Sequence, residues 1–269
     1  MDTPELSTLR LDIEGHVAWV TLSRPDKRNA MNPRMHEEMA GLIPRLNDDP
    51  ELRAIVITGA GKSFCAGADI KEYFHDLEDK PDLRRKYVEM ARHWMWDSLA
   101  QSPKATVCMI NGHCFGGGLL VAMACDIAIA GDRAVFGLPE INWGHFPGGA
   151  ASLGTIEMMG MRKALYWAMT GENFDAATAE RDGLITRAVP HDDLEAEVRR
   201  VVGLLAGKSP AAIQTIKEVY RLAPRVGMEG IHDLVTAKLD QLRARDAGGL
   251  REKGMSDFMG KRLRTTTGA

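Results

Sequence analysis

Hydrophobic and polar residues alternate with a period of two at the beginning of the chain and with a helical period soon afterwards. Residues 9–13 and 17–22 alternate on either side of a Glu-Gly-His turn, which predicts a β-hairpin. Over residues 33–46 apolar side chains recur at helical spacing, with Asn32 as a candidate helix cap and Pro33 at the first helical position. The apolar run over 54–58 predicts a strand that is buried on both faces.

The same cycle of strand and helix continues along the chain. We expect a helix over residues 83–99, a buried strand over 105–110, a helix over 117–125 and a strand over 127–130. Alternation of this kind is typical of right-handed βαβ units and a largely parallel sheet. The predicted fold class is therefore α/β.

After about residue 150 the apolar positions fall mainly at helical spacing, and only residues 184–189 suggest another strand. Helices are expected within residues 156–169, 194–205, 211–222 and 231–242. The sequence thus predicts an α/β core over residues 1–190, followed by a helical region over residues 191–269. Helices at one end of a sheet often bury their apolar faces against another subunit, so we expect an oligomer.

Composition and charge narrow the function classes. The chain has 45% hydrophobic and 26% charged residues, which is typical of a globular protein, and its net charge is −3. Without a long basic stripe, a dedicated nucleic-acid binder is not expected. No apolar run reaches the ~18 residues of a membrane span, and the first residues lack the features of a signal peptide. The four cysteines form no Cys-x-x-Cys pair. We therefore expect a cytoplasmic protein with reduced thiols and no metal site.

One motif at first suggests nucleotide binding. Residues 58–63, Thr-Gly-Ala-Gly-Lys-Ser, end like a phosphate-binding loop after a buried strand. That loop requires a glycine five positions before Gly61, where this chain has Val56, and no helical run follows. The chain also lacks a dinucleotide fingerprint, a nucleophile elbow and a His-Glu-x-x-His motif. The sequence therefore excludes nucleotide- and dinucleotide-binding proteins that use these loops, hydrolases with a nucleophile elbow and His-Glu-x-x-His metalloproteases.

Two segments that contain glycine are candidates for oxyanion binding. Residues 115–118, Phe-Gly-Gly-Gly, lie between a predicted strand and a predicted helix. Glycines allow close backbone packing, but three in a row also leave backbone N–H groups uncovered at a helix N-terminus, where negative charge is favoured. Such a turn would form half of an oxyanion hole. Residues 64–69 are also small and would supply a second N–H group, or form a compact surface turn.

Glu140 is the candidate acid/base group, because it lies in the apolar sequence Leu-Pro-Glu-Ile-Asn-Trp. Partial desolvation there would raise its pKa toward the range useful for proton transfer. The alternative is a structural glutamate that forms an ion pair with Arg133. His113 and His145 flank these segments and are either further acids or structural histidines.

Together these segments resemble the crotonase (enoyl-CoA hydratase/isomerase) superfamily, and the resemblance covers nearly the whole chain. The matching segments, in family order, are residues 24–31, 64–70, 111–118, 138–141 and 169–171. The resemblance implies a spiral of ββα and βαβ turns with a C-terminal helical trimerisation region, and trimers that often pair into hexamers. It also implies an acyl-CoA thioester substrate and no separate cofactor, since coenzyme A enters as part of the substrate.

The resemblance also implies roles for single residues. The thioester oxygen is expected between the backbone N–H groups of Ala68 and Gly117, which would stabilise an enolate. Lys27, Ala66 and Ile70 match positions that line the CoA groove.

The carboxylates of the family discriminate between its branches. Typical hydratases carry two glutamates. The second matches Glu140, whereas the first falls at Leu120, so branches with a single glutamate are favoured.

Hydroxycinnamoyl-CoA hydratase-lyases are the branch that looks most similar, through residues 69–74, 140–144 and 237–241. Enzymes of that branch hydrate feruloyl-CoA and its relatives and cleave them into an aromatic aldehyde and acetyl-CoA. Tyr73 matches a tyrosine that holds the phenolic oxygen, and Trp143 is expected to contact the substrate.

Two positions depart from that branch. A second tyrosine, from a neighbouring subunit, is replaced by Thr236, and a serine near the glycines is replaced by Leu120. Both changes leave room for another acyl group. The alternatives are therefore an enoyl-CoA hydratase or isomerase for non-aromatic chains, and a catalytically weak binding protein with the same fold.

Overall fold

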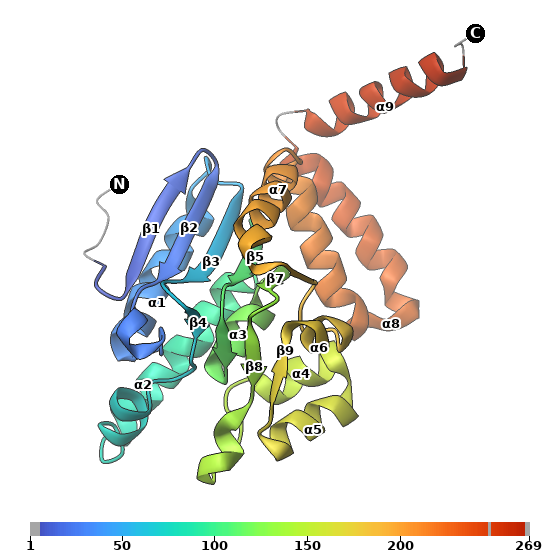
Figure 1. The fold of residues 1–269 in the computed structure, drawn as a ribbon. Coiled ribbons are helices and arrows are strands. Elements are labelled where there is room, and N and C mark those ends of the chain that lie inside the picture. Colours follow the sequence, from blue (N-terminus) through green and yellow to red (C-terminus); the bar gives the residue numbers. More distant parts are fainter. Residues whose placement is uncertain (1–5, 247–248, 267–269) are drawn as a thin grey trace. The chain divides into compact units, whose positions relative to one another are not determined.

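The computed structural model describes residues 6–246 and 249–266, and the chain forms two compact units, Met1–Ala206 and Gly207–Ala269 (Figure 1). The first unit extends past residue 190 because α7 (Leu194–Ala206) packs on strands of the sheet. The proposed division of the chain at residue 190 stays a prediction.

A six-stranded sheet forms the centre of the first unit. Its strands, in spatial order, are β1 (Leu9–Glu14), β2 (Val17–Leu22), β3 (Ala54–Gly59), β5 (Ala105–Ile110), β7 (Ile127–Gly131) and β10 (Arg187–Val189). The predicted hairpin β1–β2 is antiparallel, and all the other neighbours are parallel. The α/β prediction is confirmed, although the strand expected over residues 184–189 is limited to its last three residues.

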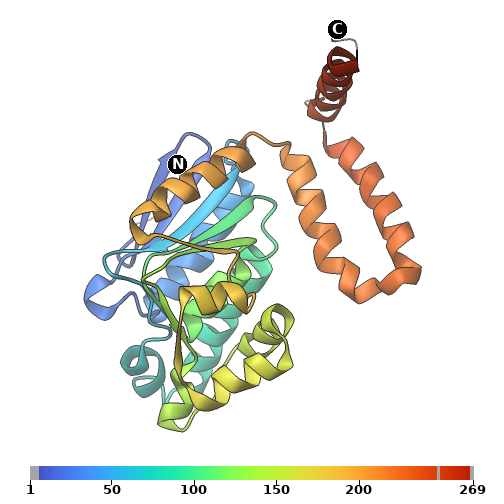
Figure 2. The ribbon, with the colours of Figure 1, turned by 45° about the vertical axis from the view of Figure 1, so that its right-hand side comes forward.

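Both faces of this sheet are covered, which explains the uninterrupted apolar runs in the sequence. Ile55 and Ile57 join the main core, to which α1 (Pro33–Asp48) contributes Met39 and Ile43. Val56 points to the opposite face, which is covered by α7 (Figure 2). Alternate residues of β3 therefore pack into two hydrophobic layers, one on each face of the sheet.

A second sheet of short strands carries the loops of the candidate site. It contains β4 (Ser63–Cys65), β6 (His113–Phe115), β8 (Val135–Gly137) and β9 (Asn173–Asp175), in that spatial order. None of these strands was predicted, because three residues are too few to show a period.

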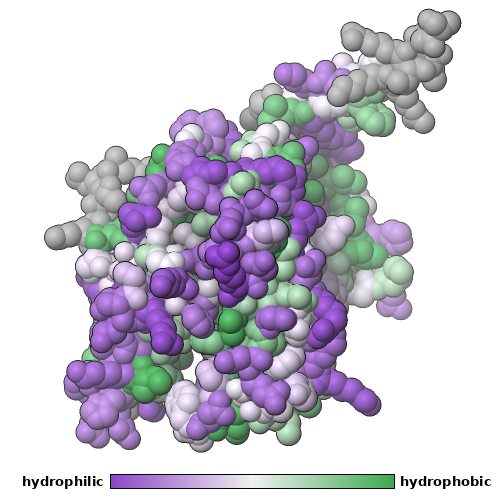
Figure 3. Space-filling view, viewed as in Figure 1, coloured by the Kyte–Doolittle hydropathy of each residue, from purple (hydrophilic) through white to green (hydrophobic). Residues whose placement is uncertain are grey.

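The remaining helices of the first unit surround the two sheets. They are α2 (Pro81–Arg92), a π-helical continuation (His93–Leu99), α3 (Gly117–Ala124), α4 (Ala151–Met159), α5 (Met161–Thr170) and α6 (Ala176–Arg181), together with a π-helix (Ile70–His75) and short 3₁₀ helices (Pro25–Lys27, Pro139–Trp143 and His191–Asp193). The helix expected over 156–169 is instead two helices, because Gly160 between them has a φ of 78°. On the face shown in Figure 3, the first unit is mainly hydrophilic.

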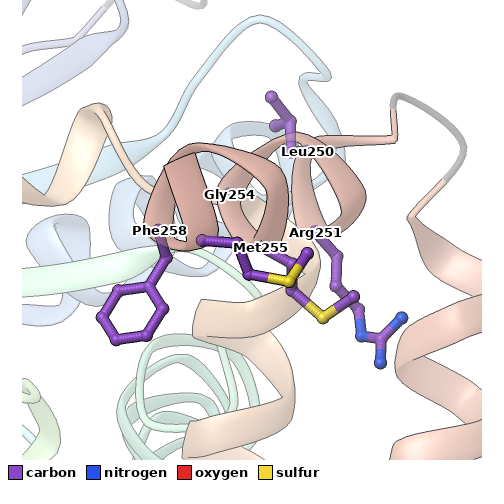
Figure 4. Close-up of a pocket in the computed structure, with 6 residues that line it drawn as sticks. Leu250, Arg251, Gly254, Met255 and Phe258 are labelled. Atoms are coloured by element: carbon purple, nitrogen blue, oxygen red, sulfur yellow. The ribbon is translucent and has the colours of Figure 1, made fainter. Parts of the chain in front are cut away.

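The second unit consists of α8 (Pro210–Arg245) and α9 (Leu250–Thr266). At Gly227 the φ of 65° and the ψ of −174° are not helical, so the chain reverses there and divides α8 into two arms. The helices predicted over 211–222 and 231–242 correspond to these two arms. The arms are joined by Glu218, which accepts hydrogen bonds from Lys238 Nζ at 2.7 Å and Arg245 Nη1 at 3.0 Å. The apolar side chains of α9, including Met255 and Phe258, line an open hollow (Figure 4). Among the described helices, none is both long and apolar enough to cross a membrane.

Candidate active site

The two glycine-containing loops leave the same edge of the second sheet. Strands β4 and β6 are parallel neighbours, with Cys65 opposite Cys114, so the loops that follow them begin side by side. The first loop is also paired with Met31, whose N–H donates to the Gly67 carbonyl at 2.7 Å and whose carbonyl accepts from the Asp69 N–H at 2.8 Å. The N–H of Ala68, between these two residues, does not take part in that pairing.

The backbone nitrogens of Ala68 and Gly117 lie close together. A Cβ atom at Gly117 would lie 3.5 Å from the Ala68 nitrogen, and one at Gly67 would lie 3.3 Å from the Gly117 nitrogen. Gly117 is the first residue of α3, so its N–H has no partner within the helix. The structure thus brings together the two N–H groups that the sequence singled out.

At each of residues 116–118 glycine is needed because a Cβ atom there would collide with a different neighbour. A Cβ at Gly116, which has a φ of 47°, would lie 2.6 Å from Glu140 Oε1. A Cβ at Gly117 would lie 2.5 Å from Met31 Cε, and one at Gly118 would lie 2.6 Å from the Cys65 carbonyl oxygen. The three glycines therefore allow Glu140, Met31 and the strand that contains Cys65 to lie at close range.

Glu140 lies in a short 3₁₀ helix (Pro139–Trp143) and reaches the turn before α3. Its Oε2 atom is buried and has no hydrogen-bond partner within the described part of the chain. Burial raises the pKa of Glu140 above its ordinary value, while a backbone hydrogen bond and His145 act in the opposite direction. Arg133 ion-pairs with Asp192 at 3.6 Å, so the alternative of a Glu140–Arg133 pair is wrong.

Both candidate histidines contact neighbouring residues of the protein. His113 Nδ1 lies 3.4 Å from Ser63 Oγ on the neighbouring strand. His145 accepts a hydrogen bond from the Phe146 N–H at 2.9 Å, and its ring lies 5.0 Å from that of Trp143.

Aromatic side chains connect the segment of Glu140 with the π-helix Ile70–His75. Phe74 of this π-helix lies 5.5 Å from Trp143 and 5.7 Å from His145, measured between ring centroids. Tyr73 lies 5.5 Å from Phe74, and burial raises the pKa of the tyrosine. We call Tyr73, Phe74, Trp143 and His145 the aromatic wall. It combines both predicted aromatic substrate contacts, Tyr73 and Trp143, in one cluster.

A buried polar network holds the π-helix in place. Asp69 caps it by accepting hydrogen bonds from the N–H groups of Lys71 and Glu72, at 3.1 and 3.0 Å. Arg24 ion-pairs with Asp69 at 3.0 Å, and Asn32 Nδ2 donates to Glu72 Oε2 at 2.7 Å. Burial raises the pKa of Asp69, but these hydrogen bonds and Arg24 outweigh it, so the net pKa is lowered. Sequence reasoning missed this network, for which the Asn32 cap was the only visible signal.

The three predicted CoA-binding residues lie in the loop after β4 or next to it. Lys27 ends the exposed 3₁₀ turn Pro25–Lys27, and the Ala66 N–H donates to the Arg28 carbonyl at 3.0 Å. Ile70 is 61% exposed at the start of the π-helix. Their contact with CoA stays a prediction.

The positions that depart from the lyase branch lie in different units. Leu120 is one turn after Gly117 on α3, and its Cδ1 would be 3.0 Å from a Cβ at Gly149. Thr236 lies in α8 of the second unit, where its hydroxyl donates to the His232 carbonyl at 2.9 Å. A substrate contact by either residue remains untested.

The chain is similar to known proteins in both sequence and fold. A sequence model of the family described as enoyl-CoA hydratase/isomerase matches residues 12–264. The chain is 39% identical to a hydroxycinnamoyl-CoA hydratase-lyase of Pseudomonas fluorescens, over 94% of this chain and 92% of the relative. It is 38% identical to a probable enoyl-CoA hydratase of Mycobacterium bovis, over 80% of this chain and 82% of the relative. Among solved structures, an enoyl-CoA hydratase from Bacillus anthracis superposes with a TM-score of 0.87 at 27% identity, covering 95% of this chain and 97% of that one.

Proposed function

The chain belongs to the enoyl-CoA hydratase/isomerase family, and we propose that within this family it is a lyase for aryl-enoyl-CoA thioesters. Its substrate would be feruloyl-CoA or a close relative, and its products an aromatic aldehyde and acetyl-CoA. The observation that carries this proposal is Glu140, whose Oε1 lies beside Gly116 at the glycine turn and whose buried Oε2 has no hydrogen-bond partner among the described residues. Its 3₁₀ helix also carries Trp143 of the aromatic wall.

In the first half of the proposed reaction, the Glu140 carboxylate takes a proton from water as the oxygen adds to the β-carbon of the thioester. The thioester oxygen gains negative charge, which the N–H groups of Ala68 and Gly117 stabilise. Glu140 then gives its proton to the α-carbon, which completes a β-hydroxyacyl-CoA. Since Leu120 occupies the position of the other family glutamate, one carboxylate performs both transfers.

In the second half, Glu140 removes the proton of the β-hydroxyl group and the bond between the α- and β-carbons breaks. The β-carbon leaves as the aldehyde, and the electron pair of the broken bond forms the enolate of acetyl-CoA in the same oxyanion hole. The proton on Glu140 then converts this enolate into acetyl-CoA. Partial burial supports this cycle, because a raised pKa lets one carboxyl group both accept and return a proton.

The aromatic wall supports an aryl group as the acyl tail. Phe74 and Trp143 offer ring faces and edges, and the Tyr73 hydroxyl would hydrogen-bond with a phenolic oxygen. We further propose that the reaction needs no cofactor, and that a trimer or a pair of trimers is the active assembly. Activity after dialysis against a chelator, and the mass in sedimentation, would test these two points.

The second candidate function is hydration of a non-aromatic enoyl-CoA, favoured by the similarity to probable enoyl-CoA hydratases and by Thr236. The test incubates the protein with feruloyl-CoA and crotonyl-CoA in parallel, without added cofactor, and follows the products by mass spectrometry. Vanillin with acetyl-CoA supports the lyase. Hydroxybutyryl-CoA without any aldehyde assigns the chain to the hydratases and overturns the lyase proposal.

A further inference from the structure

A buried histidine that has no part in the proposed proton transfers lies next to Tyr73. His36 is 2% exposed, and its ring centroid is 5.4 Å from that of Tyr73, with the planes tilted by 58°. The indole Nε1 of Trp94, which is completely buried, donates a hydrogen bond to His36 Nδ1 at 3.0 Å. These three rings join α1, the π-helical segment after α2 and the π-helix that carries the aromatic wall.

The hydrogen bond from Trp94 determines the state of the His36 ring. An indole N–H is only a donor, so His36 Nδ1 is the acceptor, and a neutral ring then carries its hydrogen on Nε2. Burial lowers the pKa of His36 to about 4, so the ring is neutral at pH 7. Trp94 therefore fixes both the tautomer and the orientation of the imidazole.

Tyr73 depends on its neighbours for the direction of its ring. Its backbone N–H is anchored to the Asp69 carbonyl at 2.8 Å, which fixes the main chain but leaves the side-chain torsions free. Within the described residues, no protein group hydrogen-bonds with the Tyr73 hydroxyl, and the aromatic rings next to Tyr73 are those of His36 and Phe74. The positive charge of Arg84 also acts on Tyr73 and lowers its pKa, against the larger effect of burial. Phe74 is the next residue on the same π-helix, so His36 is the ring contact supplied by another element.

We propose that His36 is a positioning residue for the recognition of an oxygen substituent at the far end of the acyl group. Trp94 holds the imidazole, the imidazole holds the Tyr73 ring, and the Tyr73 hydroxyl meets the phenolic oxygen of the aryl tail. This inference rests on the proposed binding of aryl-CoA thioesters, but it does not require that the thioester be cleaved.

The test measures binding, so that it remains informative whether or not the protein is a lyase. Dihydroferuloyl-CoA and 3-phenylpropanoyl-CoA have a saturated acyl chain and differ in the oxygen substituents of the ring. Their dissociation constants are measured by calorimetry for the wild type, for Trp94→Phe and for the matched control Trp96→Phe. Trp96 lies in the same π-helical segment and packs against the core, without the hydrogen bond to His36.

Trp94→Phe is expected to weaken dihydroferuloyl-CoA about fivefold to tenfold, the size of one hydrogen bond, and to leave 3-phenylpropanoyl-CoA within about twofold. Trp96→Phe should change both ligands equally. In a Tyr73→Phe background Trp94→Phe should have no further effect, because the hydroxyl that the chain of contacts positions is absent. A purely structural role would not produce this dependence on Tyr73.

A second variant keeps the inference testable if Trp94→Phe does not fold. His36→Asn retains an acceptor for Trp94 but removes the ring that contacts Tyr73, and it should show the same selective loss. Equal weakening of both ligands, or an additive loss in the Tyr73→Phe background, overturns the role of His36. Selective binding together with a failure to release aldehyde overturns the lyase proposal and leaves His36 in its role.

Discussion

The two ends of the candidate site differ in the part of the chain that forms them. At the proposed thioester end the candidate groups are the backbone N–H groups of Ala68 and Gly117, and glycine is required in the turn because added side chains would meet Met31 or Glu140. At the acyl end the groups are side chains, namely Tyr73 and its ring neighbours. A backbone group keeps its chemistry when nearby residues change, whereas a side-chain surface changes with each substitution. We therefore expect the reaction to depend on the first end and the choice of acyl group on the second.

The largest effect is expected from Glu140→Gln, which retains the shape of the side chain but removes its proton acceptor. We expect kcat to fall by about 10²- to 10⁴-fold for every thioester that the enzyme turns over. The dissociation constant for CoA should remain within about twofold, because the change is confined to the acid/base group. Steady-state kinetics and calorimetry measure the two quantities, and undiminished turnover would exclude Glu140 as the acid/base residue.

Gly117→Ala should produce the next largest effect, at the backbone end of the site. The new Cβ would lie 2.5 Å from Met31 Cε and 3.5 Å from the Ala68 nitrogen, and would thus enter the space between the two N–H groups. Loss of one oxyanion donor lowers kcat by about 10²- to 10³-fold, and we expect a decrease of this order for aryl and crotonyl thioesters alike. Gly41→Ala on α1, where a Cβ meets nothing within 4 Å, is the matched control and should leave kcat unchanged. Equal kinetics for the two variants would contradict the assigned oxyanion hole.

Acid should lower the free energy of unfolding through a residue at the acyl end of the site, His36, rather than through the thioester end. His36 has a pKa of about 4 in the folded chain against an ordinary 6.5, so between these values the unfolded state binds a proton that the folded state does not. The free energy of unfolding should therefore decrease as the pH falls from 6.5 to 4, by about 3 kcal/mol in total from this residue. Urea denaturation at several pH values measures the profile. His36→Asn should flatten it, and a profile that this substitution leaves unchanged would contradict the prediction.

Tyr73→Phe is expected to have the smallest and most selective effect. Loss of one hydrogen bond to a phenolic oxygen costs about 1 to 2 kcal/mol, which corresponds to about fivefold to thirtyfold in kcat/KM for feruloyl-CoA. Cinnamoyl-CoA has no phenolic oxygen, so its kcat/KM should remain within about twofold. A comparable loss for both substrates would show that Tyr73 supports the fold of the site rather than recognition.

Local features of the sequence predicted much of the fold and singled out the two glycine-containing loops that the structure brings together. The Asn32 cap is present, with its Oδ1 accepting a hydrogen bond from the Met35 N–H at 3.0 Å. The glycine turn was visible because its close packing requires small residues that are consecutive in the sequence. The second sheet was not predicted, because its strands have three residues each. The hydrogen bond between Trp94 and His36 was also missed. The two residues are 58 positions apart, and no local pattern in the sequence connects them.

The most direct test of the account compares kcat/KM for feruloyl-CoA and crotonyl-CoA in the wild type, Glu140→Gln and Tyr73→Phe. We predict that the wild type releases vanillin and acetyl-CoA from feruloyl-CoA. Glu140→Gln should lose activity on each substrate that the wild type uses, whereas Tyr73→Phe should lose activity on feruloyl-CoA alone. Aldehyde release by Glu140→Gln at the wild-type rate, or a parallel loss on both substrates in Tyr73→Phe, would contradict the division between a chemical end and a recognition end.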